Sequence, residues 1–221
     1  FTTPIETMKI LKNVSTHCYM LESAQANETW GRYTFLGFDP KMEITCMDGE
    51  MKIGNLKVKT EYPSDYLRQI LADYKSPRFD YLPSFTGGLV GYFSYDYIKY
   101  SEPKLKLEDR EQQDFRDMDL MLFDQVIVFD HFRQKVLLIT GVMADDLEAS
   151  YEEAVKKLEE MAQLIRNGGH MEFEPLRLQS EIQPKFPKEK YAEMVEKAKH
   201  YIREGDIFQV CLLYTSPSPR D

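Results

Sequence analysis

The 221-residue sequence is poor in the residues from which disulfide frameworks and metal sites are built. Its three cysteines, Cys18, Cys46 and Cys211, have wide and irregular spacing, which fits neither a set of disulfides nor a zinc ligand set. The four histidines are scattered, without HxxxH or HxH spacing. We therefore expect free thiols in a reducing, cytoplasmic compartment, and no metal-ligating residue is predicted.

Several other functional classes lack their sequence signals. No run approaches the roughly 18 apolar residues of a membrane helix, and the first residues lack the basic and apolar regions of a signal peptide. The formal net charge, 28 − 37 = −9, argues against nucleic acid as a partner. There is no GxSxG elbow and no GxxxxGK[ST] loop, and Gly87-Gly88-x-x-Gly91 is not the dinucleotide fingerprint. Composition and spacing therefore name no reaction and predict no catalytic residue.

Short strands and a few helices, without regular βαβ alternation, predict an α+β fold. The first half of the chain is expected to be mostly strands joined by short turns, with one helix beginning at Pro63. Asp48-Gly49 fits a hairpin turn that needs positive φ at both residues. The predicted strands lie at residues 32–38, 42–47, 51–53, 56–59, 87–96, 118–123, 125–129, 136–140 and 206–210. The later helices are predicted at 146–167, capped by Asp145-Asp146, and at 188–204, with Gly205 as the stop.

The glycine-rich strand at residues 87–96 allows two interpretations. Glycine within a strand marks a bulge or a close backbone approach. Gly87, Gly88 and Gly91 could lie beside a ligand, or could let two sheets approach each other, and we favour packing. A surface loop is expected over residues 101–117, which are charged and poor in apolar residues.

Several blocks of sequence, in a fixed order, together resemble anthranilate synthase component I, the large subunit of that enzyme. The resemblance runs from residue 3 to about residue 210. Its blocks are Thr3-Pro4-Ile5, Met20-Leu21-Glu22-Ser23, Trp30-Gly31-Arg32-Tyr33-Thr34-Phe35-Leu36-Gly37, Gly87-Gly88-Leu89-Val90-Gly91-Tyr92-Phe93-Ser94-Tyr95-Asp96, Asp117-Met118-Asp119-Leu120, Tyr191-Ala192-Glu193-Met194-Val195 and Gly205-Asp206-Ile207-Phe208-Gln209-Val210.

The resemblance implies the fold of the chorismate-utilising enzymes, with mixed antiparallel sheets and flanking helices in the N-terminal domain. It also implies an enzyme that converts chorismate and ammonia to anthranilate and pyruvate, with Mg²⁺ bound and a glutamine amidotransferase subunit (component II) as partner. The enzymes of this family are inhibited by tryptophan. The Leu-Glu-Ser motif carries over to Glu22 and Ser23 as tryptophan-binding residues, and Arg32 to the basic residue near that pocket. The competing interpretations are a strand-end hydroxyl for Ser23 and a surface residue for Arg32.

The resemblance also divides the chain. Residues 1–145 correspond to a tryptophan-sensing regulatory domain, 146–187 to a helix and an extended crossover, and 188–210 to the start of a chorismate-binding catalytic domain. Residues 211–221 contain Ser-Pro-Ser-Pro, which cannot continue a central strand, and are interpreted as an artefactual tail. The family's magnesium ligands, catalytic histidine and Pro-Tyr-Met motif are not among these residues, so the chain alone is expected to be inactive.

Two other functions remain open from the sequence. One is the large subunit of aminodeoxychorismate synthase in the folate pathway, which shares this domain. The other is a stand-alone regulatory module that binds an amino acid.

Overall fold

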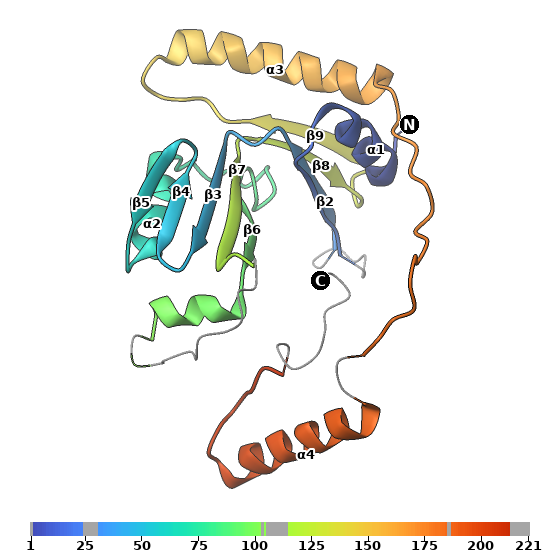
Figure 1. Ribbon diagram of the computed structural model, residues 1–221. Helices are drawn as coiled ribbons and strands as arrows, with labels where there is room; N and C mark the ends of the chain where they lie inside the picture. Colours follow the sequence, from blue (N-terminus) through green and yellow to red (C-terminus); the bar gives the residue numbers. More distant parts are fainter. Residues whose placement is uncertain (1, 24–30, 103, 105–114, 185–186, 213–221) are drawn as a thin grey trace. The chain divides into compact units, whose positions relative to one another are not determined.

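The computed structural model describes residues 2–23, 31–102, 104, 115–184 and 187–212. The chain divides into two compact units, Phe1–Glu172 and Phe173–Asp221, which are described separately. In the first unit, helices flank two antiparallel sheets (Figure 1). The predicted α+β class is confirmed.

The chain begins with a helix that the sequence analysis did not predict. This helix, α1 (Pro4–Val14), starts at an N-cap, Thr3, whose hydroxyl accepts a hydrogen bond from the Glu6 amide at 3.2 Å. Pro4 stands at the first helical position, where the missing N–H costs nothing. Ile10 and Leu11 are almost fully buried. A capped amphipathic helix was thus present in a stretch that we expected to hold strands and turns.

Sheet A has four strands in the order β1-β2-β8-β9. They are β1 (Cys18–Leu21), β2 (Tyr33–Phe38), β8 (Gln125–Asp130) and β9 (Lys135–Thr140), and every neighbouring pair is antiparallel. β2, β8 and β9 match predicted strands, whereas β1 was missed. One face packs into a buried cluster with the helices: Leu11, Leu36, Ile127, Phe129 and Met161.

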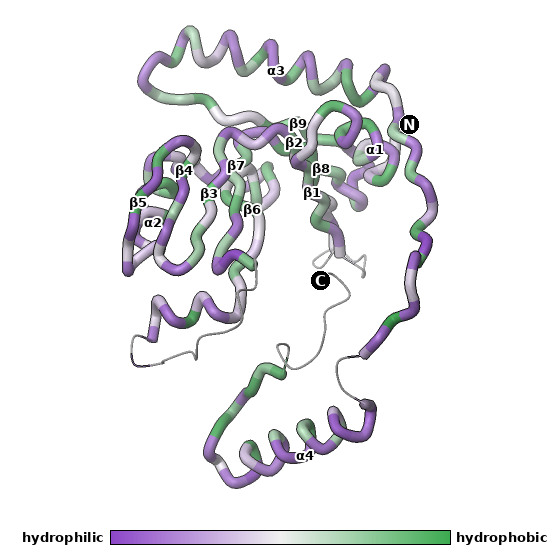
Figure 2. The backbone as a smooth tube through the Cα atoms, in the orientation of Figure 1, coloured by the Kyte–Doolittle hydropathy of each residue, from purple (hydrophilic) through white to green (hydrophobic). Residues whose placement is uncertain are grey.

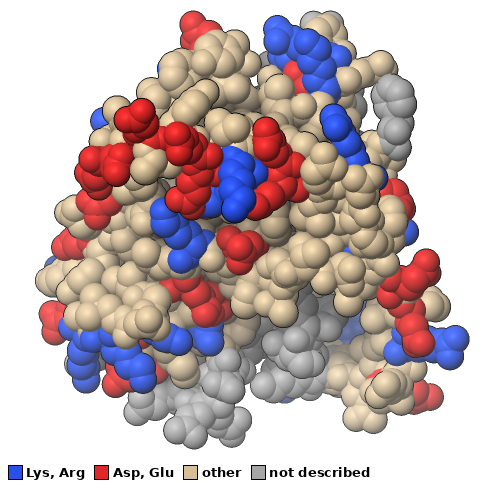
Figure 3. Space-filling model, turned by 90° about the horizontal axis from the view of Figure 1, so that it is seen from above, with Lys and Arg blue, Asp and Glu red and all other residues tan. Residues whose placement is uncertain are grey.

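The long helix α3 (Leu147–Asn167) covers the same face of sheet A as α1 does (Figure 1). It starts at Asp146, whose carboxylate accepts a hydrogen bond from the Ala149 amide, as the sequence predicted for this acidic cap. Apolar segments recur along an otherwise hydrophilic helix (Figure 2), and charges of both signs mix on the surface seen from above (Figure 3). The compact unit reaches Glu172 and includes α3, whereas the predicted domain boundary at residue 145 was drawn from the resemblance and stays a prediction.

Sheet B has five strands in the order β5-β4-β3-β7-β6, with α2 packed on one face. Its strands are β3 (Met42–Met47), β4 (Glu50–Ile53), β5 (Leu56–Lys59), β6 (Gly88–Phe93) and β7 (Met118–Phe123), and the helix is α2 (Pro63–Asp73). The turn between β3 and β4 has φ of 49° at Asp48 and 79° at Gly49, as the Asp-Gly pair predicted. Ile44, Met51 and Leu67 are among the buried residues that join α2 to the sheet.

The glycine-rich strand is explained by packing within sheet B. A Cβ at Gly91 would collide with the backbone of Asp119 and Leu120, which belong to the neighbouring strand β7. At Gly87 the φ of 135° and the nearby Phe123 carbonyl disfavour a side chain as well. The favoured interpretation, packing, is therefore supported, but the close approach is between two strands of one sheet and not between two sheets.

A buried polar network fixes the β3–β4 turn to the short 3-10 helix η1 (Tyr95–Tyr100). The Asp117 carboxylate, 7% exposed, accepts hydrogen bonds from the Tyr100 hydroxyl at 2.7 Å and the Asp48 amide at 2.8 Å. Lys99 pairs with Asp117 at 2.9 Å and with Asp48 at 2.7 Å. Burial and hydrogen bonding raise the pKa of the Tyr100 phenol. The network holds the two ends of the predicted 101–117 loop; residues 103 and 105–114 lie outside the described residues.

The second unit contains α4 (Lys188–Glu204), which ends at Gly205 in the left-handed conformation, as predicted. The strand expected at residues 206–210 does not form, and Phe208 is 98% exposed. A strand needs a partner for its backbone groups, and the described part of this unit offers none. Residues 170–184 are irregular, in agreement with the predicted extended crossover. In the described residues, no helix is both long and apolar enough to span a membrane.

Candidate functional site

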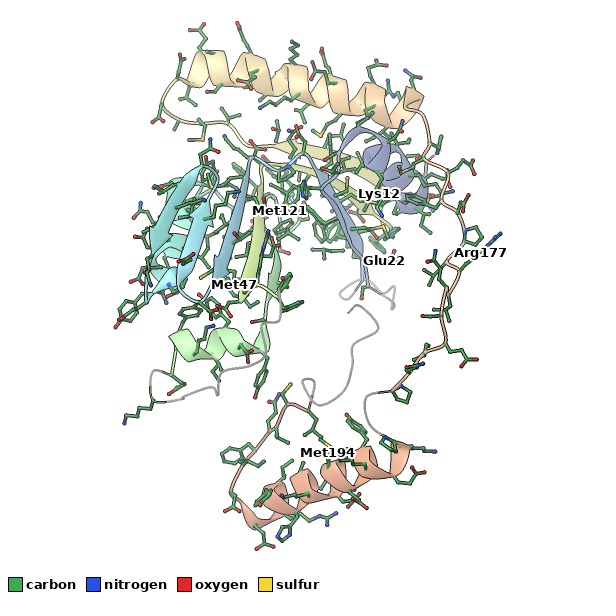
Figure 4. The ribbon with its side chains drawn as sticks, viewed as in Figure 1. Lys12, Glu22, Met47, Met121, Arg177 and Met194 are labelled. Carbon is green, nitrogen blue, oxygen red and sulfur yellow. The ribbon has the colours of Figure 1, made fainter. Side chains whose placement is uncertain are left out.

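The residues that the sequence singled out lie at one end of sheet A. β1 ends at Leu21, which pairs with Phe35 of β2, so Glu22 and Ser23 follow directly at the sheet end. Both are exposed, and Figure 4 shows Glu22 at this end of the strand. Arg32 stands one residue before β2, which starts at Tyr33. The fold therefore brings the three predicted residues to the same edge, and residues 24–30 between them lie outside the described residues.

Arg32 is held in place by a carboxylate from a distant strand. Its Nε donates to Oδ1 of Asp130 at 3.0 Å and its Nη2 donates to Oδ2 at 2.5 Å. The guanidinium also lies 4.8 Å from the ring centre of Tyr33 and 5.5 Å from that of Phe132. The hydrogen bonds from Arg32 hold the pKa of the Asp130 carboxyl down at about 2. Arg32 is thus a half-buried, fixed cation and not a loosely held surface residue.

Asp130 and His131 were not singled out by the sequence. Asp130 is the last residue of β8, and His131 begins the turn to β9. The Thr34 hydroxyl lies 2.7 Å from Nε2 of His131, and the His131 amide donates to the Arg32 carbonyl at 2.9 Å. The only sequence signal for them was an Asp-His pair at the start of a turn between two predicted strands. Asp is common in turns because its side chain hydrogen-bonds the turn backbone, so the pair did not indicate a binding site.

The strand register decides which side chains share a face. Tyr33 pairs with Asp130, and Leu21 pairs with Phe35, so these four lie on the face of sheet A that is not covered by α1. If the alternation of β1 continues for two residues, Ser23 joins this face and Glu22 points to the other. The site then offers a hydroxyl, a fixed cation and apolar surface, because Leu21 is 47% exposed and Tyr33 half-buried.

Behind this edge, aromatic rings fill the space between the two sheets of the first unit. The Tyr19 ring meets Phe123 of β7 at 4.7 Å, and Phe35 meets Phe85 at 5.7 Å, both edge to face. A Cβ at Gly37 would collide with the Tyr19 ring, so glycine is required there. These contacts give the site a rigid apolar support.

A hollow of about 550 Å³ lies elsewhere in the first unit, between the 74–88 loop and the ends of β7 and β9. Its Lys41 lies 3.7 Å from Asp124 and 5.1 Å from the centre of the Tyr74 ring. None of the residues predicted from the sequence lines it.

The donor set does not fit the magnesium ion that the resemblance implied. Within the described ranges, no three His, Cys, Asp or Glu side chains gather where they could hold a metal. Asp130, the most perturbed carboxyl, is already used by Arg32 and by the Arg133 amide. The Mg²⁺ that the resemblance implies for the parent enzyme stays a prediction.

Comparison with known sequences identifies the family of the chain. The sequence profile of the chorismate binding enzymes matches residues 16–219, which is most of the chain. The chain belongs to this family.

The similar proteins are large subunits of anthranilate synthase. The chain is 34% identical to anthranilate synthase component 1 of Acinetobacter calcoaceticus, over 94% of its own length and 43% of the relative's. The corresponding Aquifex aeolicus protein is 32% identical over 95% of this chain and 44% of its own. The crystal structure of anthranilate synthase component I from Streptococcus pneumoniae superposes with a TM-score of 0.62 at 29% identity, covering 93% of this chain and 44% of that one. The chain thus spans less than half the length of these relatives, and the predicted resemblance is confirmed.

Proposed function

We propose that the chain is the tryptophan-sensing, N-terminal part of an anthranilate synthase large subunit. The parent enzyme is a lyase that converts chorismate and ammonia to anthranilate and pyruvate in tryptophan biosynthesis. Glutamine, through a component II partner, supplies the ammonia, and Mg²⁺ acts in the parent active site. The similarity to anthranilate synthase component 1 over nearly the whole chain supports the pathway.

The single observation that supports the sensing role is the clustering of Ser23 and Arg32 at one end of sheet A, beside apolar surface. A zwitterionic amino acid needs acceptors for its ammonium, a cation for its carboxylate and an apolar slot for its side chain. Ser23 supplies an acceptor and Arg32 supplies the cation. Glu22 can act as a second acceptor only by reaching round the end of sheet A, because strand alternation points it to the other face. Tyr33 and Leu21 supply apolar surface for an indole ring.

The proposal assigns no chemical step to this chain. The chain covers less than half the length of its relatives, and the proposal leaves the ammonia addition and the pyruvate elimination to the rest of the parent enzyme. Feedback inhibition would then pass from the end of sheet A to that active site.

The test is a titration of the chain with tryptophan, followed by protein-observed NMR. We expect millimolar binding, with shifts concentrated at the end of sheet A. Ser23→Ala should weaken it about tenfold, because a hydrogen bond to a charged group contributes about 1.5 kcal/mol or more. The matched control is Ser101→Ala, an exposed serine after η1, which should leave the affinity unchanged. If Ser23→Ala has no effect, the site assignment is wrong, although the family assignment stands.

A further inference from the structure

Asp130 is more deeply buried than a carboxylate tolerates without hydrogen-bond or ion-pair partners. Its side chain is 4% exposed, at the point where β8 ends. A buried charge is costly unless it is paired and hydrogen-bonded. Both of its oxygens accept hydrogen bonds from Arg32, which is 98 residues away in the sequence. The fold therefore places a carboxylate behind the one cation that the proposed effector site uses.

The two hydrogen bonds determine the orientation of the guanidinium. A carboxylate that accepts from Nε and Nη2 together fixes the plane of the group as well as its position. The rings of Tyr33 and Phe132, at 4.8 and 5.5 Å, limit its movement further. The Arg32 side chain is only 21% exposed, so solvent has little part in holding it.

Asp130 is itself fixed by the sheet. Its Oδ1 accepts a hydrogen bond from the Arg133 amide at 2.9 Å, which closes the β8–β9 turn. The backbone of Arg32 is tied to the same turn, since the His131 amide donates to the Arg32 carbonyl at 2.9 Å. The orientation of the cation is thus set by rigid strands, which hold a binding group more accurately than a loop does.

We propose that Asp130 is the positioning residue of the effector site: it orients the Arg32 guanidinium toward the carboxylate of an aromatic amino acid without touching the ligand. This inference rests on the proposed function, because it takes the end of sheet A as the site. It predicts that Asp130 controls affinity only for ligands that carry a carboxylate.

The test compares three probes by protein-observed NMR: tryptophan, indole-3-propionate, which lacks the ammonium, and tryptamine, which lacks the carboxylate. Asp130→Asn should weaken tryptophan and indole-3-propionate about tenfold and leave tryptamine unchanged, because only the carboxylate contact depends on the guanidinium plane. The Arg32 Nε–Hε resonance gives a direct signature. It should be sharp in the wild type and broadened or lost in Asp130→Asn.

Two further variants separate positioning from stability. Asp117→Asn breaks another buried ion pair, with Lys99 of η1, and should change none of the three affinities. The double variant Arg32→Asp with Asp130→Arg keeps an ion pair, and with it the fold, even if Asp130→Asn does not fold. Because its cation lies on β8, it should not recover carboxylate binding.

The outcomes are distinct. Three results would each overturn the positioning role. Asp130→Asn could weaken tryptamine as much as tryptophan, or it could leave tryptophan binding unchanged or tighter. The third such result is recovery of carboxylate binding in the double variant. In those cases the effector site still stands if Ser23→Ala weakens tryptophan. If no probe shifts any resonance at the end of sheet A in the wild type, the effector site and the positioning role both fall.

Discussion

The Asp130–Arg32 pair should also make the stability of the first unit depend on pH in a defined window. The pKa of the Asp130 carboxyl falls from 3.8 to about 2 on folding. A shift of that size corresponds to at most about 2.5 kcal/mol at about 1.36 kcal/mol per unit, and screening at the partly exposed Arg32 reduces it to about 1–2 kcal/mol. This stabilisation is fully present above the unfolded pKa and is lost as the pH falls through the folded one.

The perturbation is Asp130→Asn, followed by urea unfolding at several pH values between 7 and 2. At pH 7 the variant should lose about 2–4 kcal/mol of unfolding free energy, because one charge-assisted hydrogen bond from Arg32 is lost and the other is weakened when the carboxylate becomes a neutral amide. The difference from the wild type should stay constant down to about pH 5 and shrink by about 1–2 kcal/mol toward pH 2, where the wild-type carboxyl becomes protonated.

The control is Asp65→Asn, which breaks an ion pair with Arg68 on the surface of α2. The Asp65 side chain is 69% exposed. Such a pair contributes little, so the variant should lie within about 0.5 kcal/mol of the wild type at every pH. Two results would refute the linkage argument. The unfolding free energies of Asp130→Asn and the wild type could differ by less than about 0.5 kcal/mol at pH 7, which is the scatter expected of neutral surface substitutions. Alternatively, their difference could stay the same between pH 5 and pH 2.

Three further predictions concern catalysis and packing. The chain should form no fluorescent anthranilate from chorismate, Mg²⁺ and ammonia, and product above the blank would contradict the proposed division of labour. Gly91→Ala should lower the unfolding free energy by about 2–4 kcal/mol, since its Cβ would collide with the β7 backbone; a change near zero in urea unfolding would show that β6 can move away. Leu36→Ala, at a fully buried position, should cost about 2–5 kcal/mol. Leu176→Ala, 95% exposed, should cost less than about 0.5 kcal/mol, and similar losses in thermal unfolding would contradict the assigned core.

The elements predicted correctly are those whose signals are local. The Asp48-Gly49 turn, the Asp146 cap and the Gly205 stop each follow from the conformations that those residues favour. The errors have physical causes too. α1 was missed although its signals are local: Thr3-Pro4 is a helix start, and Ile5, Met8 and Leu11 recur at helical spacing. The strand expected at 206–210 has suitable residues, but β structure requires a partner that sequence pattern alone does not provide.

The sequence by itself determined the family, through ordered blocks of residues, and the α+β class, through short strands between amphipathic helices. It also pointed to Ser23, Glu22 and Arg32, though only by resemblance. The tertiary structure alone decided that Arg32 is held by Asp130, and that Ser23 and Arg32 lie at one edge. The physical reason is sequence distance: 98 residues separate Arg32 from Asp130, and only the β2–β8 register brings the cation and the carboxylate together.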